Sequence, residues 1–259
     1  MKISIITVSF NSVSTIRDTI NSVQNQSYKN IEHIIIDGNS SDGTVDIIKE
    51  YKNIKFISEP DDGIYYAMNK GVNLSSGDVI GFLNSDDIFM DEKCVEEIAR
   101  SFAMEEEIDL VFGNIFIVSQ KDIYKTIRFN KPGKFKKGKL MKGWLPPHPT
   151  LYMKKKIFDN LDGFNTSFKI QADFEMMIRI FEKNDFKSFY IDKALVRQRF
   201  GGASTRISNL LRGNIEASNA CKINGYPGGV YFIMVKMLSR LPQFINRPRT
   251  KTNLDHETR

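Results

Sequence analysis

The first ninety residues alternate between short apolar runs and segments whose apolar residues recur every three or four positions. The runs are rich in Ile, Val and Phe, residue types that favour strands, and they occupy residues 3–10, 31–37, 54–58 and 79–83. The intervening segments have the spacing of one apolar helix face, and they cover residues 14–25, 45–51 and 64–73. Alternating strands and helices predict an α/β fold with a mostly parallel sheet.

The pattern is less regular after residue 90. Strands are predicted at residues 109–118, 123–129, 150–153 and 188–199. Helices are predicted at residues 91–102, 157–161, 173–183, 207–221 and 230–241. The first two of these strands follow each other closely and are expected to pair. The last residues, 246–259, are polar and are expected to be a disordered tail.

Polar residues follow each of the first four strands. They are Ser9 to Asn11, Asp37, Asp61-Asp62 and Asp86-Asp87. The carboxyl ends of parallel strands meet at one edge of a sheet, where open α/β folds bind ligands. We therefore expect these residues to line one site. The fingerprint of dinucleotide-binding folds, GxGxxG, does not follow the first strand.

The stretch Asn84-Ser85-Asp86-Asp87 ends the fourth strand and carries the strongest chemical signal. Adjacent carboxylates repel each other and are costly to dehydrate, unless a cation lies between them and a polyanion. Oxygen ligands of this kind favour Mg²⁺ or Mn²⁺, held through one or two carboxylates and substrate phosphates. The alternative is a polar turn that caps the helix predicted at 91–102, because Ser and Asp are common cap residues.

Composition adds limits to this picture. A chain of 259 residues, 41% of them hydrophobic and 26% charged, can form one large domain with an appended segment. Cys94 and Cys221 form neither a disulfide framework nor a CxxC metal motif, so a reducing cytosol is expected. The strand-like start lacks the features of a signal peptide, and no run of about 18 apolar residues predicts a membrane-spanning helix.

The net charge of +6 is unevenly placed. Six lysines gather in one segment, at Lys131, Lys134, Lys136, Lys137, Lys139 and Lys142. Such charge attracts nucleic acid, an anionic membrane or a phosphorylated substrate, or it forms a solvated face. No zinc spacing or RNP-like aromatic pattern supports nucleic acid, which is not expected as a partner. Residues 230–245 mix apolar and cationic positions and would lie on an anionic membrane surface, or pack on the domain as an ordinary helix.

Several segments match a known family in order and spacing. They are Ser4 to Asn11, Ile36 to Thr44, Glu59 to Tyr65, Ala67 to Gly71, Ser76 to Asp78 and Asn84 to Asp87. Residues 1–205 thereby resemble glycosyltransferase family 2, in the bacterial branch that builds O-antigen, capsule and exopolysaccharide units. The resemblance implies a GT-A catalytic domain, with a nucleotide-binding sheet flanked by helices and an acceptor-side region, and makes 206–245 a C-terminal helical extension.

The resemblance also assigns contacts to the nucleotide. The residues implied are Thr7, Ser9, Asn11, Asp37, Asp62, Gly63, Asn69 and Ser85. Asp37 would accept a hydrogen bond from the uracil N3–H. Turn and cap roles remain the alternative for four of them, Asp37, Asp62, Gly63 and Asn69.

A metal site is implied at the end of the fourth strand. Asp86 resembles the last Asp of the family's DxD motif, which ligates Mn²⁺ or Mg²⁺ on the diphosphate, and Asp87 and Asn84 are further candidate ligands. Asn84 stands where the family has Asp, which leaves the metal with less charge. Met68 stands where the family often has Arg, so an Arg–phosphate contact is missing there.

The segment Gln171 to Glu175 resembles the family's Glu-Asp motif, with Ala172 in place of Glu. Asp173 is then the candidate base that takes the proton of the acceptor hydroxyl as C1 of the sugar is attacked. Glu175 is the second candidate for that role, and a helix N-cap is the alternative role for Asp173. A single displacement of this kind inverts the anomeric centre.

Four further residues are expected near the acceptor or the donor sugar. They are Trp144, His148, Gly201 and Gly202. An indole face suits the C–H face of a sugar, and the Gly-Gly turn would let the backbone approach the diphosphate. Core packing for Trp144, a structural role for His148 and a plain turn at the glycines remain the alternatives.

The resemblance implies metal-dependent, inverting transfer of a sugar from a UDP-sugar to a saccharide carried on a lipid diphosphate, in surface polysaccharide biosynthesis. The enzyme would act at the inner face of the cell membrane as a peripheral protein. One rival is a nucleotidyltransferase acting on sugar phosphates, although the Gly-rich basic loop of that class is absent after the first strand. The other is an inactive nucleotide- or glycan-binding protein, which Asn84 and Ala172 keep open.

Overall fold

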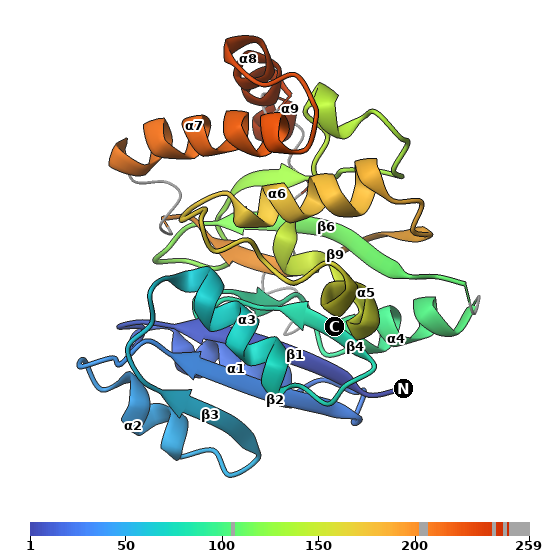
Figure 1. The fold of residues 1–259 in the computed structure, drawn as a ribbon. Coiled ribbons are helices and arrows are strands. Elements are labelled where there is room, and N and C mark those ends of the chain that lie inside the picture. Colours follow the sequence, from blue (N-terminus) through green and yellow to red (C-terminus); the bar gives the residue numbers. More distant parts are fainter. Residues whose placement is uncertain (105–106, 202–206, 240–241, 246–247, 249–259) are drawn as a thin grey trace.

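The computed structural model describes residues 1–104, 107–201, 207–239, 242–245 and 248. In this part of the chain one sheet runs in the order β3-β2-β1-β4-β8-β6-β9-β5, and β7 pairs with the second half of β6. The strands are β1 (Ile3–Ser9), β2 (Ile31–Asp37), β3 (Ile54–Ser58), β4 (Val79–Phe82), β5 (Ile88–Phe89), β6 (Leu110–Val118), β7 (Thr126–Asn130), β8 (Tyr152–Lys154) and β9 (Ser188–Arg199). Figure 1 shows helices on both faces of this sheet.

The first four strands are parallel to one another. β1 lies between β2 and β4, and β3 pairs with the outer edge of β2. The register places Ser9, the last residue of β1, opposite Asp37, the last residue of β2. The polar residues that follow these strands therefore meet at one edge of the sheet, as the sequence predicts.

Alternation along β1 explains why helices cover both faces. Ile6 and Val8 pack with α3 (Ile64–Leu74), whereas Ile3 and Ile5 pack on the side of α1 (Ile16–Gln24) and α4 (Cys94–Met104). The helix α2 (Thr44–Lys49) covers the outer strands on the same side as α1. Gly71 lets α3 lie close on β1, since a Cβ there would come 2.5 Å from Cγ2 of Ile6.

Beyond β4 the sheet becomes mixed. β8 pairs antiparallel with both β4 and β6, while β9 runs parallel to β6 and antiparallel to the two-residue strand β5. Short helical segments connect these strands: α5 (Lys155–Asn160) and the 3-10 turns η1 (Leu140–Lys142) and η2 (His148–Thr150). The second half of the chain thus extends the sheet formed by β1 to β4 instead of forming a separate one.

The C-terminal helices pack on this second half. α7 (Ile207–Ile223) lies against α6 (Ala172–Ile178), which continues into a π-helical turn, η3 (Arg179–Lys183). Ala217, Ala220 and Cys221 of α7 are fully buried in the main hydrophobic core. α8 (Val230–Leu238) and α9 (Pro242–Ile245) follow, and Figure 1 places all three helices at the end of the molecule opposite α2 and β3.

The predicted secondary structure is confirmed for every strand and helix named above except β5, η1, η2 and α9. The hydrophobic pattern does not predict these four short elements, and the helix predicted at 173–183 divides into α6 and η3. The tail predicted to be disordered, 246–259, lies outside the described residues apart from Pro248. Within the described residues, none of the helices has the length and apolar character needed to cross a bilayer.

Candidate active site

Asp37, the last residue of β2, is fully buried and accepts four hydrogen bonds. Its Oδ1 accepts from the hydroxyls of Ser9, at 2.8 Å, and Ser40, at 2.6 Å. Its Oδ2 accepts from the N–H of Ser40, at 2.8 Å, and the hydroxyl of Ser58, at 2.7 Å. Burial opposes the charged form, but the four bonds outweigh it and lower the pKa of Asp37. A ligand N–H can bind this carboxylate only by displacing one of these donors.

The loops after β1, β2 and β4 are tied together by short polar side chains. Asn11 has a positive φ of 50°; its N–H donates to the Ser40 hydroxyl at 2.8 Å and its side-chain oxygen accepts from the Ser41 N–H at 3.0 Å. The hydroxyls of Ser12 and Ser85 lie 2.8 Å apart. The structure thus brings together four predicted nucleotide-binding residues, Ser9, Asn11, Asp37 and Ser85.

Thr7 lies below this edge, inside the sheet. Its side chain is fully buried, and its hydroxyl oxygen lies 3.0 Å from Nε2 of His33 on β2. Burial lowers the pKa of His33 to about 3, so the ring is neutral at physiological pH. The hydroxyl of Thr7 is therefore paired inside the sheet, between β1 and β2. The structure thus places Thr7, a predicted nucleotide contact, in the interior of the sheet.

Asp86 and Asp87 follow β4 in a turn that the Asp87 N–H closes by donating to the Asn84 carbonyl at 3.0 Å. Asp87 is fully buried; its Oδ2 accepts from the Asn84 amide at 3.0 Å, and its Oδ1 has no partner among the described residues. Burial raises the pKa of Asp87 well above its ordinary value, and the charge of Asp86 raises it further. Burial also raises the pKa of Asp86, although Arg199 opposes that shift.

Arg199 is a site residue that the sequence alone does not reveal. This last residue of β9 is buried, and its guanidinium donates to the backbone carbonyl of Asp86 at 2.8 Å and to Oδ2 of Asp18 at 2.6 Å. It therefore places a positive charge beside the acidic turn. The sequence signal is an Arg just before the Gly201 turn, but only the pairing of β9 with β6 and β5 brings it to β4.

The acidic turn fits a divalent cation in its donor chemistry. Among the described residues no three His, Cys, Asp or Glu side chains form a complete metal-binding group. Mg²⁺ and Mn²⁺ are commonly held by one or two carboxylates, with substrate phosphates completing the shell. Asp86 and Asp87 supply two carboxylates, the second with an unpartnered buried oxygen, and neither forms an ion pair within the described part of the chain.

Asp173 lies in the first turn of α6, beside α3. Its Oδ1 accepts from the N–H of Phe174 at 2.8 Å and lies 3.0 Å from the hydroxyl of Tyr65 on α3. Its charge also acts on His148 of η2. A half-buried carboxylate with one oxygen held in this way is suited to accept a proton from a bound hydroxyl group.

Glu175, the second candidate base, is committed to the core. The guanidinium of Arg179 donates to both of its oxygens at 2.8 to 3.0 Å, and the side-chain amide of Asn224 donates to Oε1 at 3.0 Å. Arg179 in turn donates to the carbonyls of Leu161 and Gly163. With its residue only 3% exposed, Glu175 joins α6, α7 and the loop after α5, which leaves Asp173 as the accessible carboxylate of the pair.

Comparison with known proteins identifies the family to which this chain belongs. The model of the family described as glycosyl transferase family 2 matches residues 4–162, which is more than half of the chain. The chain belongs to glycosyl transferase family 2. It is therefore a glycosyltransferase. Among its relatives is the PGL/p-HBAD biosynthesis glycosyltransferase of Mycobacterium tuberculosis, which is 25% identical over 210 residues, a match that covers 79% of each chain.

Solved structures with the same fold are more distant in sequence. This family 2 glycosyltransferase superposes on S. aureus TarS in complex with UDP-GlcNAc with a TM-score of 0.67 and 15% identity, covering 100% of this chain and 76% of TarS. It superposes on a mannosyltransferase of Pyrobaculum calidifontis in complex with GDP-Man and Mn²⁺ with a TM-score of 0.63 and 12% identity, covering 92% and 69%. These likenesses establish the GT-A fold of the glycosyltransferase.

His148, one of the residues predicted to contact a sugar, lies within electrostatic reach of the candidate base. Its ring stacks on Phe82, the last residue of β4, with centroids 5.2 Å apart. Burial lowers the pKa of His148, and Asp173 opposes that shift. Trp144 instead packs edge-on against Phe112 and Phe181 in the core of the glycosyltransferase, and its indole N–H donates to the Pro132 carbonyl at 2.8 Å. Both the apolar and the polar part of Trp144 therefore have structural partners.

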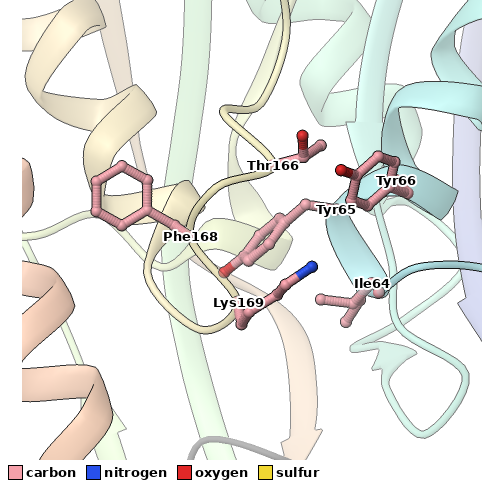
Figure 2. A pocket seen from close by; sticks show the side chains of 7 residues that line it. Ile64, Tyr65, Tyr66, Thr166, Phe168 and Lys169 are labelled. Atoms are coloured by element: carbon pink, nitrogen blue, oxygen red, sulfur yellow. The ribbon is translucent and has the colours of Figure 1, made fainter.

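Asn69 joins the middle of α3 to the loop that contains Phe164, and Gly63 precedes the helix. The amide group of Asn69 both donates to and accepts from the backbone of Phe164, each at 2.9 Å. Gly63 has a φ of 139°, a conformation that favours glycine, directly before α3. Lys169 donates to the carbonyl of Asp62 at 2.9 Å. Figure 2 shows the small pocket at this junction, lined by Gly63, Ile64, Tyr65, Tyr66, Thr166, Phe168 and Lys169.

The predicted Gly-Gly turn follows Arg199. Gly201 is exposed with a φ of 126°, and a Cβ there would meet only Gln120, at 3.4 Å. Gly202 lies outside the described residues. Gly201 lies two residues after Arg199, which contacts the acidic turn. The approach of the Gly-Gly turn to a diphosphate stays a prediction.

Proposed function

We propose that this glycosyltransferase moves a sugar from a UDP-sugar to an acceptor hydroxyl group with inversion at C1. The acceptor oxygen forms a bond to C1 while the bond from C1 to the diphosphate oxygen breaks. The electron pair leaves with UDP, and Asp173 takes the hydroxyl proton. The observation that carries the proposal is the contrast between Asp87, which is fully buried in the acidic turn after β4, and Asp173 of α6, which is half-buried, because such contrasts separate ligand-holding from proton-accepting carboxylates.

The acidic turn is proposed to hold Mn²⁺ or Mg²⁺. Asp86 and Asp87 would bind the ion, with Asn84 beside them. When bound, the ion would neutralise the charge that develops on the departing diphosphate. Arg199 adds a positive charge on the same side of the turn, through its contact with the Asp86 backbone. Support comes from the raised pKa values of the two carboxylates, which a neighbouring cation would relieve.

The donor nucleotide is proposed to be UDP. A carboxylate at the position of Asp37 can accept the uracil N3–H, provided that one hydroxyl donor, from Ser9, Ser40 or Ser58, rotates away. The complex of TarS with UDP-GlcNAc supports this choice, whereas the archaeal mannosyltransferase is in complex with GDP-Man. Competition between UDP and GDP for the purified protein separates the two donors directly.

The acceptor is proposed to be a saccharide on a lipid diphosphate, used in surface polysaccharide biosynthesis. Support comes from the C-terminal helices, which expose apolar side chains: Leu211, Ile215 and Ile223 of α7, Met234, Met237 and Leu238 of α8, and Phe244 of α9. We call these residues the C-terminal surface. Leu211 is 74% and Met237 63% exposed, values that suit side chains entering a lipid interface.

The lysine-rich segment lies beside this surface. η1 packs against α8, where the Ser239 hydroxyl donates to the Gly143 carbonyl at 3.0 Å, and Arg128 of β7 lies over the Phe244 ring. In the described part of the chain three exposed lysines of the segment form no ion pair: Lys134, Lys136 and Lys142. Cations next to exposed apolar groups match an anionic membrane. We therefore place the enzyme at the inner face of the cell membrane as a peripheral protein.

A donor screen tests the proposed function. Purified protein is incubated with a panel of UDP- and GDP-sugars, with and without Mn²⁺, and release of UDP or GDP is measured alone and with lipid-linked saccharides. We expect release from one UDP-sugar, dependence on the metal, and loss of both in Asp86→Ala with the fold retained. Release of pyrophosphate from UTP and a sugar phosphate would identify a nucleotidyltransferase. Nucleotide binding without release from any donor would identify an inactive binding protein.

A further inference from the structure

The segment 169–173, which leads into α6 and ends at the candidate base, is held from two sides by parts of the chain far away in sequence. Tyr65 of α3 contacts it on one side and Glu216 of α7 on the other. We propose that Tyr65 and Glu216 are positioning residues that fix Asp173 for proton transfer, so that the C-terminal helix α7 is part of the catalytic apparatus. This inference rests on the proposed role of Asp173 as the base.

The hydroxyl of Tyr65 contacts the segment at two residues. It lies 2.8 Å from the carbonyl oxygen of Ile170 and 3.0 Å from Oδ1 of Asp173. The tyrosine is 7% exposed, and its ring packs against Phe164 with centroids 5.3 Å apart, so the hydroxyl has little freedom to move. Oδ1 of Asp173 also accepts the N–H of Phe174, whereas Oδ2 accepts no hydrogen bond among the described residues. The arrangement reserves Oδ2 for a substrate proton.

Glu216 holds the backbone of the same segment. Its carboxylate accepts from three successive N–H groups: those of Lys169 at 3.1 and 3.2 Å, Ile170 at 2.8 Å and Gln171 at 3.1 Å. Arg212, one turn earlier on α7, donates to Oε1 at 2.9 Å. Backbone donors that precede a helix otherwise need a cap or water. A buried carboxylate that fills three of them fixes the path of the loop.

The local structure of α6 explains why Asp173 needs contacts from α3 and α7. α6 has only seven residues, and the side chain at its N-cap, Gln171, makes no capping hydrogen bond. Asp173 therefore lies in the first turn of a short helix whose N-terminus has no side-chain cap. Catalytic groups must be held within roughly 0.5 Å of their working positions. Tyr65 and Glu216 supply that constraint from α3 and α7.

Tyr65→Phe is the sharpest test, since it removes one hydroxyl and keeps the ring. We expect kcat to fall about tenfold, with KM for the donor and the Kd for UDP changed by less than about twofold. A fall in kcat with KM and the Kd for UDP nearly unchanged separates a misplaced base from a loss of binding or of the fold.

Tyr66→Phe is the matched control. Tyr66 is the next residue of α3, is 40% exposed, and its hydroxyl makes no hydrogen bond to the described residues. Its kcat is expected to equal that of the unmodified enzyme. An unchanged kcat in Tyr65→Phe would overturn the positioning role of Tyr65.

Glu216→Gln tests the second contact. The amide keeps the size of the side chain but carries no charge and offers one oxygen in place of two, so it holds the three backbone N–H groups less strongly and loses the bond from Arg212 to Oε1. We expect kcat to fall about tenfold or more while the Kd for UDP changes little, because the described hydrogen bonds of Glu216 go to residues 169–171 and Arg212 and to none of the predicted nucleotide contacts. Wild-type kcat in Glu216→Gln would overturn this role. If Glu216→Gln fails to fold, Tyr65→Phe still decides the proposal.

Asp173→Asn distinguishes failure of this inference from failure of the proposed function. If Asp173→Asn keeps full turnover, Asp173 is not the base, and the proposed function is wrong at that point. If Asp173→Asn loses turnover while Tyr65→Phe and Glu216→Gln keep it, the base stands and the positioning roles are wrong. Loss in all three, with UDP binding retained, is the result expected from the proposal.

Discussion

At the residue scale, three aspartates of the candidate site have different environments. Asp37 accepts four hydrogen bonds, and its pKa is lowered. Asp87 has a buried oxygen without a partner among the described residues, and its pKa is raised. Asp173 has hydrogen-bonding partners at one oxygen. The sequence places all three where ligands bind but cannot distinguish them. Part of each environment comes from residues distant in sequence, as when Tyr65 contacts Asp173 and Asn224 donates to Glu175.

Asp87→Asn is expected to stabilise the metal-free enzyme. The pKa of Asp87 is raised in the folded protein, so its contribution to stability is lost as pH rises above the unfolded value of about 4. At neutral pH the uncharged amide of Asn removes the free-energy cost of burying an ionised carboxylate. We expect a higher Tm in EDTA at pH 7, a smaller loss of stability between about pH 4 and 7, and no further rise in Tm on adding Mn²⁺.

Asp37→Asn is the control with the opposite sign. Its pKa is lowered in the folded state, so the ionised group stabilises the fold at neutral pH, and the amide is expected to lower the Tm. Thermal unfolding of both variants by circular dichroism in EDTA checks the pair. A lower Tm for metal-free Asp87→Asn would show that the buried carboxylate is already satisfied without a cation.

At the element scale, the hydrophobic pattern predicts this fold well where apolar runs end in turn residues. The bounds predicted for β2 and β3 equal those observed, since Asp37 and Ser58 end both runs. β5 escapes prediction because a two-residue strand carries no pattern and exists only by pairing with β9, a hundred residues later. The same reason hides Arg199 and Glu216, whose roles follow from the packing of β9 and α7 rather than from local sequence.

Gly81→Ala tests how β4 is held in the sheet. A Cβ on Gly81 would overlap the ring of Tyr152 on β8, and that ring is fully buried and cannot move aside. We expect a loss of about 3 kcal/mol in the free energy of unfolding, the upper end of the usual overpacking range. Urea unfolding measures it. Gly38→Ala, whose Cβ would meet nothing closer than 3.4 Å, is expected to cost much less; equal losses would contradict the packing of β4 on β8.

At the scale of the whole molecule, the outer strand β3 and the C-terminal helices belong to different ends of one structure. α2 and β3 lie at one end and α7 to α9 at the other, with β4 and α6 between them (Figure 1). α7 contributes both to the core and to the exposed surface. An enzyme arranged in this way would bind a membrane at one end while keeping the donor site in water.

Replacing Lys134, Lys136 and Lys142 with Gln should weaken membrane binding. Each cation near an anionic surface contributes about 1 kcal/mol, so the three changes are expected to lower binding to anionic vesicles by roughly a hundredfold at low salt. Vesicle sedimentation measures this. Binding of the unmodified protein should also fall as salt rises, because exposed charges are screened.

The matched control replaces three exposed lysines elsewhere on the surface, Lys49, Lys52 and Lys121, which removes the same net charge. It should bind vesicles almost as well as the unmodified protein. Equal losses in both triple variants, or equal binding to neutral and anionic vesicles, would refute an anchor formed by the C-terminal surface and the lysine-rich segment.

The central claim is that Asp173 accepts the proton in a sugar transfer supported by the acidic turn. The most direct test is single-turnover transfer by Asp173→Asn with the UDP-sugar found in the donor screen, alongside calorimetric measurement of UDP binding in Mn²⁺. The account predicts a fall in rate of about 10² or more with UDP affinity changed by less than about twofold. A rate equal to that of the unmodified enzyme, or a collapse of UDP affinity together with the rate, would contradict it.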